Sequence, residues 1–183
     1  ANQVGLIRTK TDFEGIVFKG VSTDYDWTFF KEYLIAGRIP DFNQKRTRDV
    51  LLSKTIINRL QLQLNDTINV TFFKSKASKL PSNRKLVITG IYNTGFLEFD
   101  KNMMIGDIRQ VQRLNRWSEN EVGGFEVILE NFDELQQKGT EIYKEIDATL
   151  DATTIASNYP GLFEWIELFD NNTWFIIIIM ILV

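Results

Sequence analysis

The stretch Thr67–Tyr92, TINVTFFKSKASKLPSNRKLVITGIY, decides how the middle of the chain folds. In its first part Ile68, Val70 and Phe72 alternate with other residues, and this period of two predicts a half-buried β-strand. The run Leu86–Tyr92 at its end is rich in apolar and β-branched residues and predicts a second strand. We expect the two strands to pair antiparallel across the basic segment between them.

That connecting segment, residues 74–85, carries five bases and no acid. One interpretation is an exposed, positively charged hairpin that docks an acidic partner and steers its approach. The alternative is a solvated loop whose lysines protect the strand edges from pairing with other chains. Nucleic acid is a weaker candidate, because the adjoining Phe72 and Phe73 face opposite sides of a strand and form no stacking platform.

The segment that follows, GIYNTGFLEFD at residues 90–100, predicts a sharp turn. If the segment is extended, Glu98 and Asp100 lie on the same side, and two carboxylates are the minimum for glycosidase-type acid–base chemistry. Nothing in the sequence raises the pKa of one carboxyl above the other, and no EF-hand spacing surrounds them. We therefore interpret the segment as a structural turn, built on Gly90, Gly95, Glu98 and Asp100, without a metal site.

The rest of the chain predicts short alternating elements, and no internal repeat is present. A polar, basic stretch at residues 43–48 precedes a short VLLS strand. The fold class that this order predicts is α+β with mostly antiparallel pairing. The main elements are a hairpin (3–9 with 15–21), a helix from Thr28 to Ala36 ended by Gly37, helices capped by Ser53 and Asp107, a strand at 124–130, a helix from Asp133, a strand at 152–156 and a helix from Pro160.

The composition excludes several kinds of chemistry. The chain has no Cys and no His, so it cannot build a thiolate or imidazole zinc site, a Cys nucleophile or a Ser-His-Asp triad. Phosphate-loop and nucleophile-elbow motifs are also absent from the sequence. The net charge of −3 gives no overall attraction for nucleic acid. We expect no cofactor, and any chemistry that remains must use carboxylates, Lys or Tyr.

The last ten residues, Trp174–Val183, are all apolar and read WFIIIIMILV. A ten-residue apolar run can be a buried strand or core helix, and it is about half of the roughly 20 residues that span a bilayer. It begins with Trp, as interfacial belts often do, and no Lys or Arg lies between Lys144 and the last residue. The positive-inside rule then places the preceding residues on the non-cytoplasmic side. We interpret the run as the start of a transmembrane helix.

The order of several motifs resembles the large extracytoplasmic domain of lipoprotein-releasing (Lol-type) ABC transporter permeases, within the wider MacB-like and FtsX-like permease group. The likeness extends from about Val4 to the tail, and the ordered set of motifs carries it more than any single one. The motifs are GIVFKGV (15–21), YLIAGRIPDF (33–42), DVLLSKTIINRLQLQLNDTINVTFF (49–73), LVITGIYNTGFLEFDKNMMI (86–105) and GFEVILEN (124–131).

The resemblance implies a domain of two parts followed by a membrane helix. A discontinuous, porter-like α+β portion would comprise residues 1–22 and 121–172, an inserted β-rich, sabre-like portion residues 23–120, and the start of the transmembrane helix residues 173–183. In one permease type of this family a hairpin loop called the hook recruits a carrier, and the basic connection falls where the hook lies. The implied partner-binding residues are Lys74, Lys76, Lys79, Leu80, Pro81, Arg84 and Lys85.

The implied function is non-catalytic docking and mechanical coupling in the bacterial inner membrane, with this domain in the periplasm. The implied partners are a cytoplasmic ABC ATPase subunit, a second permease subunit, a periplasmic lipoprotein carrier and its lipoprotein cargo. Two alternatives stay open. One is a MacB-like efflux or FtsX-like signalling permease. The other is a soluble carboxylate-dependent hydrolase in which the apolar tail belongs to the core.

Overall fold

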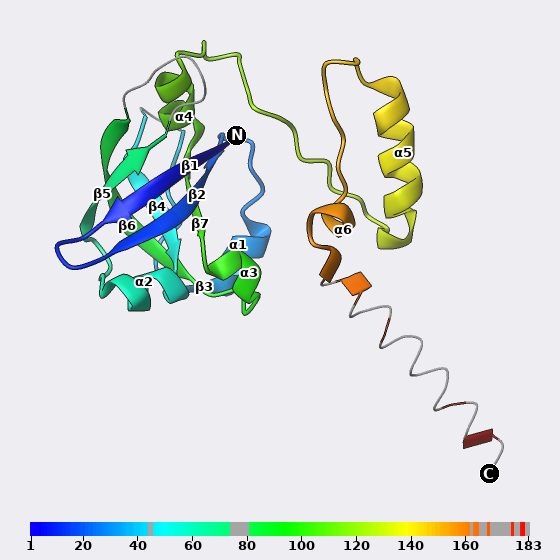
Figure 1. Ribbon diagram of the computed structural model, residues 1–183, viewed down its shortest axis with the longest axis horizontal. Coiled ribbons are helices and arrows are strands. Elements are labelled where there is room, and N and C mark those ends of the chain that lie inside the picture. The colour runs from blue at the N-terminus through cyan, green and yellow to red at the C-terminus, as the bar shows by residue number, and fades with distance from the viewer. Residues whose placement is uncertain are drawn as a thin grey trace. The chain divides into compact units, whose positions relative to one another are not determined.

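The computed structural model describes residues 1–43, 46–73 and 81–161, together with residues 163, 164, 168, 177, 180 and 181 of the tail (Figure 1). The chain divides into two units, Ala1–Phe125 and Glu126–Val183. The first unit is mixed α/β. Its elements are β1 (Asn2–Arg8), β2 (Phe13–Val21), α1 (Thr28–Tyr33), β3 (Leu34–Gly37), β4 (Asp49–Ser53), α2 (Lys54–Leu60), β5 (Thr67–Phe72), β6 (Ser82–Tyr92), α3 (Leu97–Asp100), β7 (Met103–Asp107) and α4 (Ile108–Asn115).

The strands of the first unit form a small closed barrel. They hydrogen-bond in the order β3-β6-β4-β7-β2-β1-β5, and β5 also pairs with β6, which joins the two sides of the sheet. Closure is possible because β6 is long: its residues 82–87 pair with β5 and its residues 87–92 pair with β4. The predicted hairpin of β1 with β2 and the predicted antiparallel pairing of β5 with β6 are both confirmed.

The barrel interior is the main core. Strand alternation sends Ile68, Val70 and Phe72 of β5 inward, where each is at most 3% exposed, as the sequence pattern predicts. The interior also holds Phe18, whose ring meets the edge of the Phe72 ring at a centroid distance of 5.5 Å. A second, largely aromatic cluster lies on the outer face, with Val21, Phe30, Phe42, Leu51, Tyr92 and Ile105 as its buried members.

Two capped helices lie at opposite ends of the barrel. Helix α2 follows β4 directly and α4 follows β7 directly, and because β4 and β7 are antiparallel the helices emerge at different ends (Figure 1). Ser53 Oγ accepts a hydrogen bond from the Ile56 amide, and Asp107 Oδ1 accepts one from the Arg109 amide. Both predicted caps are confirmed, since each satisfies an amide that the first helical turn leaves unpaired.

The region after Thr28 differs from expectation. A single helix up to Ala36 is predicted, but the helix ends at Tyr33 and residues Leu34–Gly37 form β3, paired with the end of β6. The edge of β6 presents backbone N–H and C=O groups that residues 34–37 can hydrogen-bond only as a strand. This sheet pairing overrides the local preference for a helix. Gly37 has φ of +79°, a left-handed conformation that favours glycine, and it ends the strand instead of the helix.

The second unit contains the 3₁₀ helix η1 (Phe132–Glu134), α5 (Leu135–Glu145) and α6 (Ile155–Asn158). The prediction of strands at 124–130 and 152–156 is wrong. Residues 124–130 have no regular structure, and α6 begins within residues 152–156. In the described part of the chain no strand pairs with either segment, and an unpaired apolar run has no ladder to join. The described side chains of α5 include no buried residue.

The predicted start of a transmembrane helix, residues 173–183, lies outside the described residues apart from Ile177, Met180 and Ile181. Among the residues that the structure describes, no helix is long and apolar enough to cross a membrane. Residues 1–22 form β1 and β2 in the same sheet as strands of the middle section. Their predicted grouping with residues 121–172, apart from an inserted portion at 23–120, stays a prediction.

Candidate functional site

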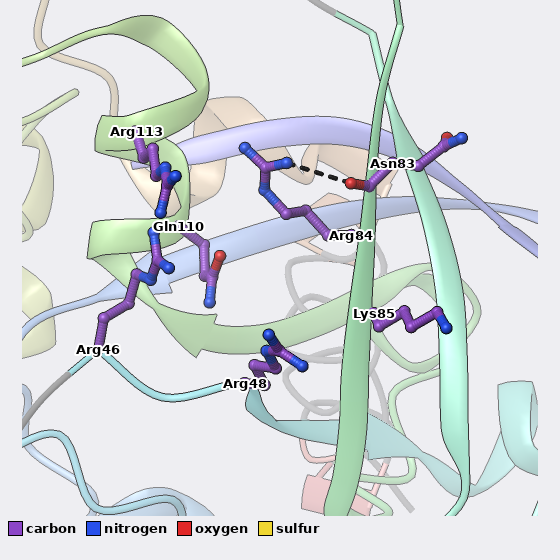
Figure 2. A pocket seen from close by; sticks show the side chains of 7 residues that line it. All are labelled: Arg46, Arg48, Asn83, Arg84, Lys85, Gln110 and Arg113. Carbon is purple, nitrogen blue, oxygen red and sulfur yellow. Dashed lines mark hydrogen bonds between the residues drawn. The ribbon is translucent and has the colours of Figure 1, made fainter.

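A basic pocket lies at the end of the barrel where α4 begins. Seven residues line a cavity of about 280 Å³, and Figure 2 shows their side chains. They come from the segment just before β4, from the first half of β6 and from α4. The lining residues are Arg46, Arg48, Asn83, Arg84, Lys85, Gln110 and Arg113, and we call this site the arginine pocket.

Strand alternation explains why Arg84 enters the pocket. Leu86 and Ile88 of the same strand are buried in the barrel, so Arg84 lies on the same inward face, two residues nearer the barrel end. Its cross-strand partner on β5 is Val70, which is fully buried. Figure 2 shows Arg84 extending toward Arg113, whereas Asn83 and Lys85 extend to the other side of β6. On the inward face of β6, Arg84 thus places a guanidinium where the next two inward positions hold the aliphatic residues Leu86 and Ile88.

Arg48 approaches from a neighbouring strand. Its carbonyl accepts a hydrogen bond from the Val87 amide at 2.8 Å, which begins the parallel pairing of β4 with β6. Val50 lies two residues later and is buried in the core, so alternation also places Arg48 on the inward side. Figure 2 shows its side chain below those of Arg46 and Arg84, with all three directed toward a common space.

Hydrogen bonds fix the segment that carries Arg46 and Arg48 to the start of α4. Gln110 Nε2 donates to the Thr47 carbonyl at 2.6 Å, and the Thr47 amide donates to Asp107 Oδ2 at 3.0 Å. Asp107 is itself paired with Arg109, whose Nε lies 2.8 Å from Asp107 Oδ1. The nearest buried carboxylate is thus already neutralised, and it serves to hold the backbone between the two arginines.

The arginine pocket carries an uncompensated positive charge. Its lining contains no carboxylate, and in the described part of the chain Arg46, Arg48, Arg84 and Arg113 form no ion pair. Burial lowers the pKa of Arg84, and repulsion from Arg113 and Arg46 lowers it further. Guanidinium groups remain charged at any physiological pH, so four like charges lie near one another here, three of them on exposed residues and that of Arg84 half-buried.

The predicted partner-binding residues are only partly brought together. Lys74, Lys76, Lys79 and Leu80 lie outside the described residues. Pro81 is exposed just before β6, while Arg84 and Lys85 point to opposite faces of that strand. Five pocket residues were missed: Arg46, Arg48, Asn83, Gln110 and Arg113. The basic composition of residues 43–48 was a signal, but its proximity to Arg84 depends on a parallel strand pairing that the sequence did not predict.

The segment around Asp100 is a turn in which the two carboxylates separate. The extended conformation in which Glu98 and Asp100 would share one side does not occur, because α3 makes residues 97–100 helical and residues two apart on a helix diverge. The side chain of Glu98 is 64% exposed, whereas Asp100 is buried. The Asp100 carboxylate accepts hydrogen bonds from the Thr94 amide and hydroxyl and from the Gly95 amide. Such an arrangement does not suit paired acid–base chemistry.

The two glycines of this segment have different environments. Gly95 has φ of +78°, a left-handed conformation, and lies within the loop that Asp100 organises. Gly90 lies inside β6, where Leu51 and the Arg38 carbonyl come too close for a side chain. One glycine thus permits the turn, and the other permits close packing between strands.

Comparison with known proteins gives a structural likeness. No protein-family model matches the chain, and no curated protein sequence matches it. Among solved structures, the crystal structure of the extracellular domain of the noncanonic ABC-type transporter YknZ from Gram-positive bacteria matches with a TM-score of 0.50 and 14% identity. The match covers 79% of this chain and 70% of that chain. At this identity the likeness shows that this chain shares the fold of that domain.

Proposed function

We propose that this chain is the extracytoplasmic domain of an ABC transporter permease and acts by binding and movement, without catalysis. The structural likeness to the YknZ extracellular domain is the observation that supports this most directly. The sequence adds an independent argument, since an apolar run at 174–183 follows a segment without bases, as on the outer side of a membrane. ATP hydrolysis would then belong to a cytoplasmic subunit, and the domain would transmit its motion to a partner outside the membrane.

Cysteine labelling tests this location, because the chain has no cysteine of its own. Thr11 is exposed in the turn between β1 and β2, so Thr11→Cys presents a single accessible thiol. In intact spheroplasts we expect a membrane-impermeant maleimide to label Thr11→Cys fully. The matched control is Val50→Cys, buried at 1% exposure, which we expect to react only after denaturation. Labelling of Thr11→Cys only after the membrane is permeabilised would contradict an extracytoplasmic location.

We further propose that the transported cargo is lipoprotein and that the basic connection 74–85 docks a periplasmic carrier, with a second permease subunit completing the transporter. The sequence resemblance and the five bases of this segment support the proposal. Its charge predicts docking to an acidic surface and a binding rate that falls with salt. The likeness to an ABC transporter domain is also compatible with a MacB-like efflux permease, which would not bind a lipoprotein carrier.

Charge reversal separates these two possibilities. We expect Lys79→Glu combined with Arg84→Glu to reduce capture of the carrier at low salt by at least about tenfold, since like charges across an interface cost several kcal/mol. The control, Lys10→Glu with Lys54→Glu, makes the same charge change at two exposed positions outside the connection. Equal carrier capture by wild type, test variant and control would count against docking at this segment.

A further inference from the structure

We propose that the arginine pocket is a binding site for a phosphate group. This inference goes beyond the transporter role and does not depend on it, because it concerns a ligand held by one set of side chains on the described barrel. The pocket residues converge from three separate segments, as Figure 2 shows, and they line an open cavity of about 280 Å³. That volume is slightly below the range of about 300–1,000 Å³ for drug-sized ligands, so a small charged group suits it.

The geometry of the side chains favours an oxyanion. A guanidinium presents a planar fork of N–H donors that matches carboxylate or phosphate oxygens two at a time. Arg46, Arg84 and Arg113 extend toward one another in Figure 2, although like charges repel. In the absence of an acidic partner, a bound anion would turn this repulsion into attraction. Arg46, Arg48 and Arg113 are exposed and Arg84 is half-buried, so an anion can reach all four from solvent.

The number of charges favours phosphate over a carboxylate. Arg46, Arg48, Arg84 and Arg113 supply four guanidiniums, whereas a carboxylate carries one charge and two oxygens. A phosphate monoester carries about −1.5 to −2 charges at pH 7 and has three strong acceptor oxygens. It can therefore accept hydrogen bonds from several guanidiniums at once and neutralise more of their charge.

The supporting hydrogen bonds make the site preorganised. Gln110 and Asp107 hold Thr47 through its carbonyl and amide, and this fixes the backbone between Arg46 and Arg48. Arg84 is held by the β5–β6 ladder, and Arg113 by helix α4. Binding therefore requires the ordering of four side chains but little movement of the backbone, which reduces the entropic cost of association.

Thermal unfolding with inorganic phosphate tests the site, using the full chain in a mild non-ionic detergent. At constant ionic strength maintained with chloride, we expect phosphate to raise the midpoint temperature of the wild type in a saturable way, as a ligand of the folded state does. In Arg84→Gln combined with Arg113→Gln, the phosphate concentration for half-saturation should rise at least about tenfold, because the variant loses two charged donors to the phosphate oxygens.

The control is Lys10→Gln combined with Lys54→Gln. This control also removes two positive charges, but at the other end of the barrel. Lys10 is exposed just after β1, and Lys54 is exposed at the start of α2. This control should keep the wild-type response to phosphate. Equal responses of the Arg84/Arg113 variant and the control, or no response of the wild type beyond that to chloride, would overturn the proposal.

A second signature appears without any ligand. Because the arginines repel one another, Arg84→Gln with Arg113→Gln should unfold at the same temperature as the wild type or higher in low-salt, phosphate-free buffer. The substitutions leave no buried acceptor without its donor, since the hydrogen bond of the Arg84 side chain goes to the exposed carbonyl of adjacent Asn83. A clear fall in the midpoint temperature would contradict the uncompensated charge on which the proposal rests.

The source of the phosphate can be distinguished in the same preparation. Micelles doped with phosphatidylglycerol are compared with micelles doped with diacylglycerol of the same acyl chains, which lacks the phosphate. Stabilisation by phosphatidylglycerol that inorganic phosphate competes away, and that Arg84→Gln with Arg113→Gln abolishes, indicates a lipid headgroup. Stabilisation by inorganic phosphate alone indicates a free phosphate or soluble phosphate ester. Either result supports the site, and the absence of both overturns it without affecting the transporter role.

Discussion

Replacing Asp100 with alanine is expected to lower the free energy of unfolding by about 3 kcal/mol, because it leaves two amides of the turn without an acceptor. The carboxylate accepts hydrogen bonds from the amides of Thr94 and Gly95, both at 3.1 Å, and from the Thr94 hydroxyl at 2.8 Å. The Asp100 residue itself is only 2% exposed, so its carboxylate binds the loop from the buried side. Urea unfolding followed by far-UV circular dichroism would measure the loss.

The effect should extend beyond the turn. Ser53 Oγ caps α2 by accepting from the Ile56 amide and also donates to the Asp100 carbonyl. The Asp100 turn is therefore linked to the start of a helix that buries three residues in the core or next to it. Hydrogen exchange at the first amides of α2 should become faster in Asp100→Ala than in the wild type under conditions where both remain folded.

Glu98 provides the matched control for this prediction. It lies two residues earlier on the same short helix, and its carboxylate is exposed beside Lys101 at 3.7 Å. Exposed ion pairs contribute about 0–1 kcal/mol, so Glu98→Ala should change stability by no more than that. Asp100→Asn, which keeps one acceptor oxygen, should fall between the two. Equal effects of Glu98→Ala and Asp100→Ala would mean that the buried carboxylate does not hold the turn.

The features that could be predicted from sequence are local ones. The β1–β2 and β5–β6 hairpins follow from alternating apolar residues on either side of a polar connection, and the register confirms both. The caps at Ser53 and Asp107 follow from a side-chain oxygen placed just before an apolar helical pattern. In each hairpin the two strands follow one another in the sequence, and in each cap the side chain lies within three residues of the amide it binds.

The arginine pocket could not be predicted for the opposite reason. Arg48 and Arg84 come together through the parallel pairing of β4 with β6, and Arg113 joins them because α4 follows β7 at that end of the barrel. No local pattern specifies which distant strands become neighbours. The sequence did mark the basic stretch at 43–48 and the basic connection at 74–85, but it gave no reason to place a helix beside them.

Two errors have a common physical origin. Leu34–Gly37 was expected to continue a helix, but the edge of β6 supplied backbone partners and made it a strand. The run at 124–130 was expected to be a strand, but in the described part of the chain no strand pairs with it. Alternating apolar residues and β-propensity indicate that a segment's side chains would suit a sheet. A strand forms only where another strand is available to pair with it.

The largest loss of stability is expected from the barrel interior, where Phe18 packs against a glycine. Phe18 is fully buried, and Phe18→Ala should cost about 3–5 kcal/mol because it leaves a cavity in a closed barrel. The ring occupies space that a side chain on Gly106 would fill: a Cβ at that position would lie 2.7 Å from Phe18 Cζ and 2.8 Å from Phe18 Cε2. Gly106→Ala should therefore cost about 1–3 kcal/mol through overpacking.

A double-mutant cycle tests whether these two positions share one space. Phe18→Leu removes the outer ring atoms that a methyl group on residue 106 would meet, so Gly106→Ala should be better tolerated in that background. We expect the combined loss to be smaller than the sum of the single losses by about 1 kcal/mol, as for residues in direct contact. Urea unfolding of the four proteins gives the coupling energy. Additive losses would show that the strain of Gly106→Ala is relieved elsewhere, since Val50 Cγ1, at 3.1 Å from the same Cβ, is the next neighbour able to move.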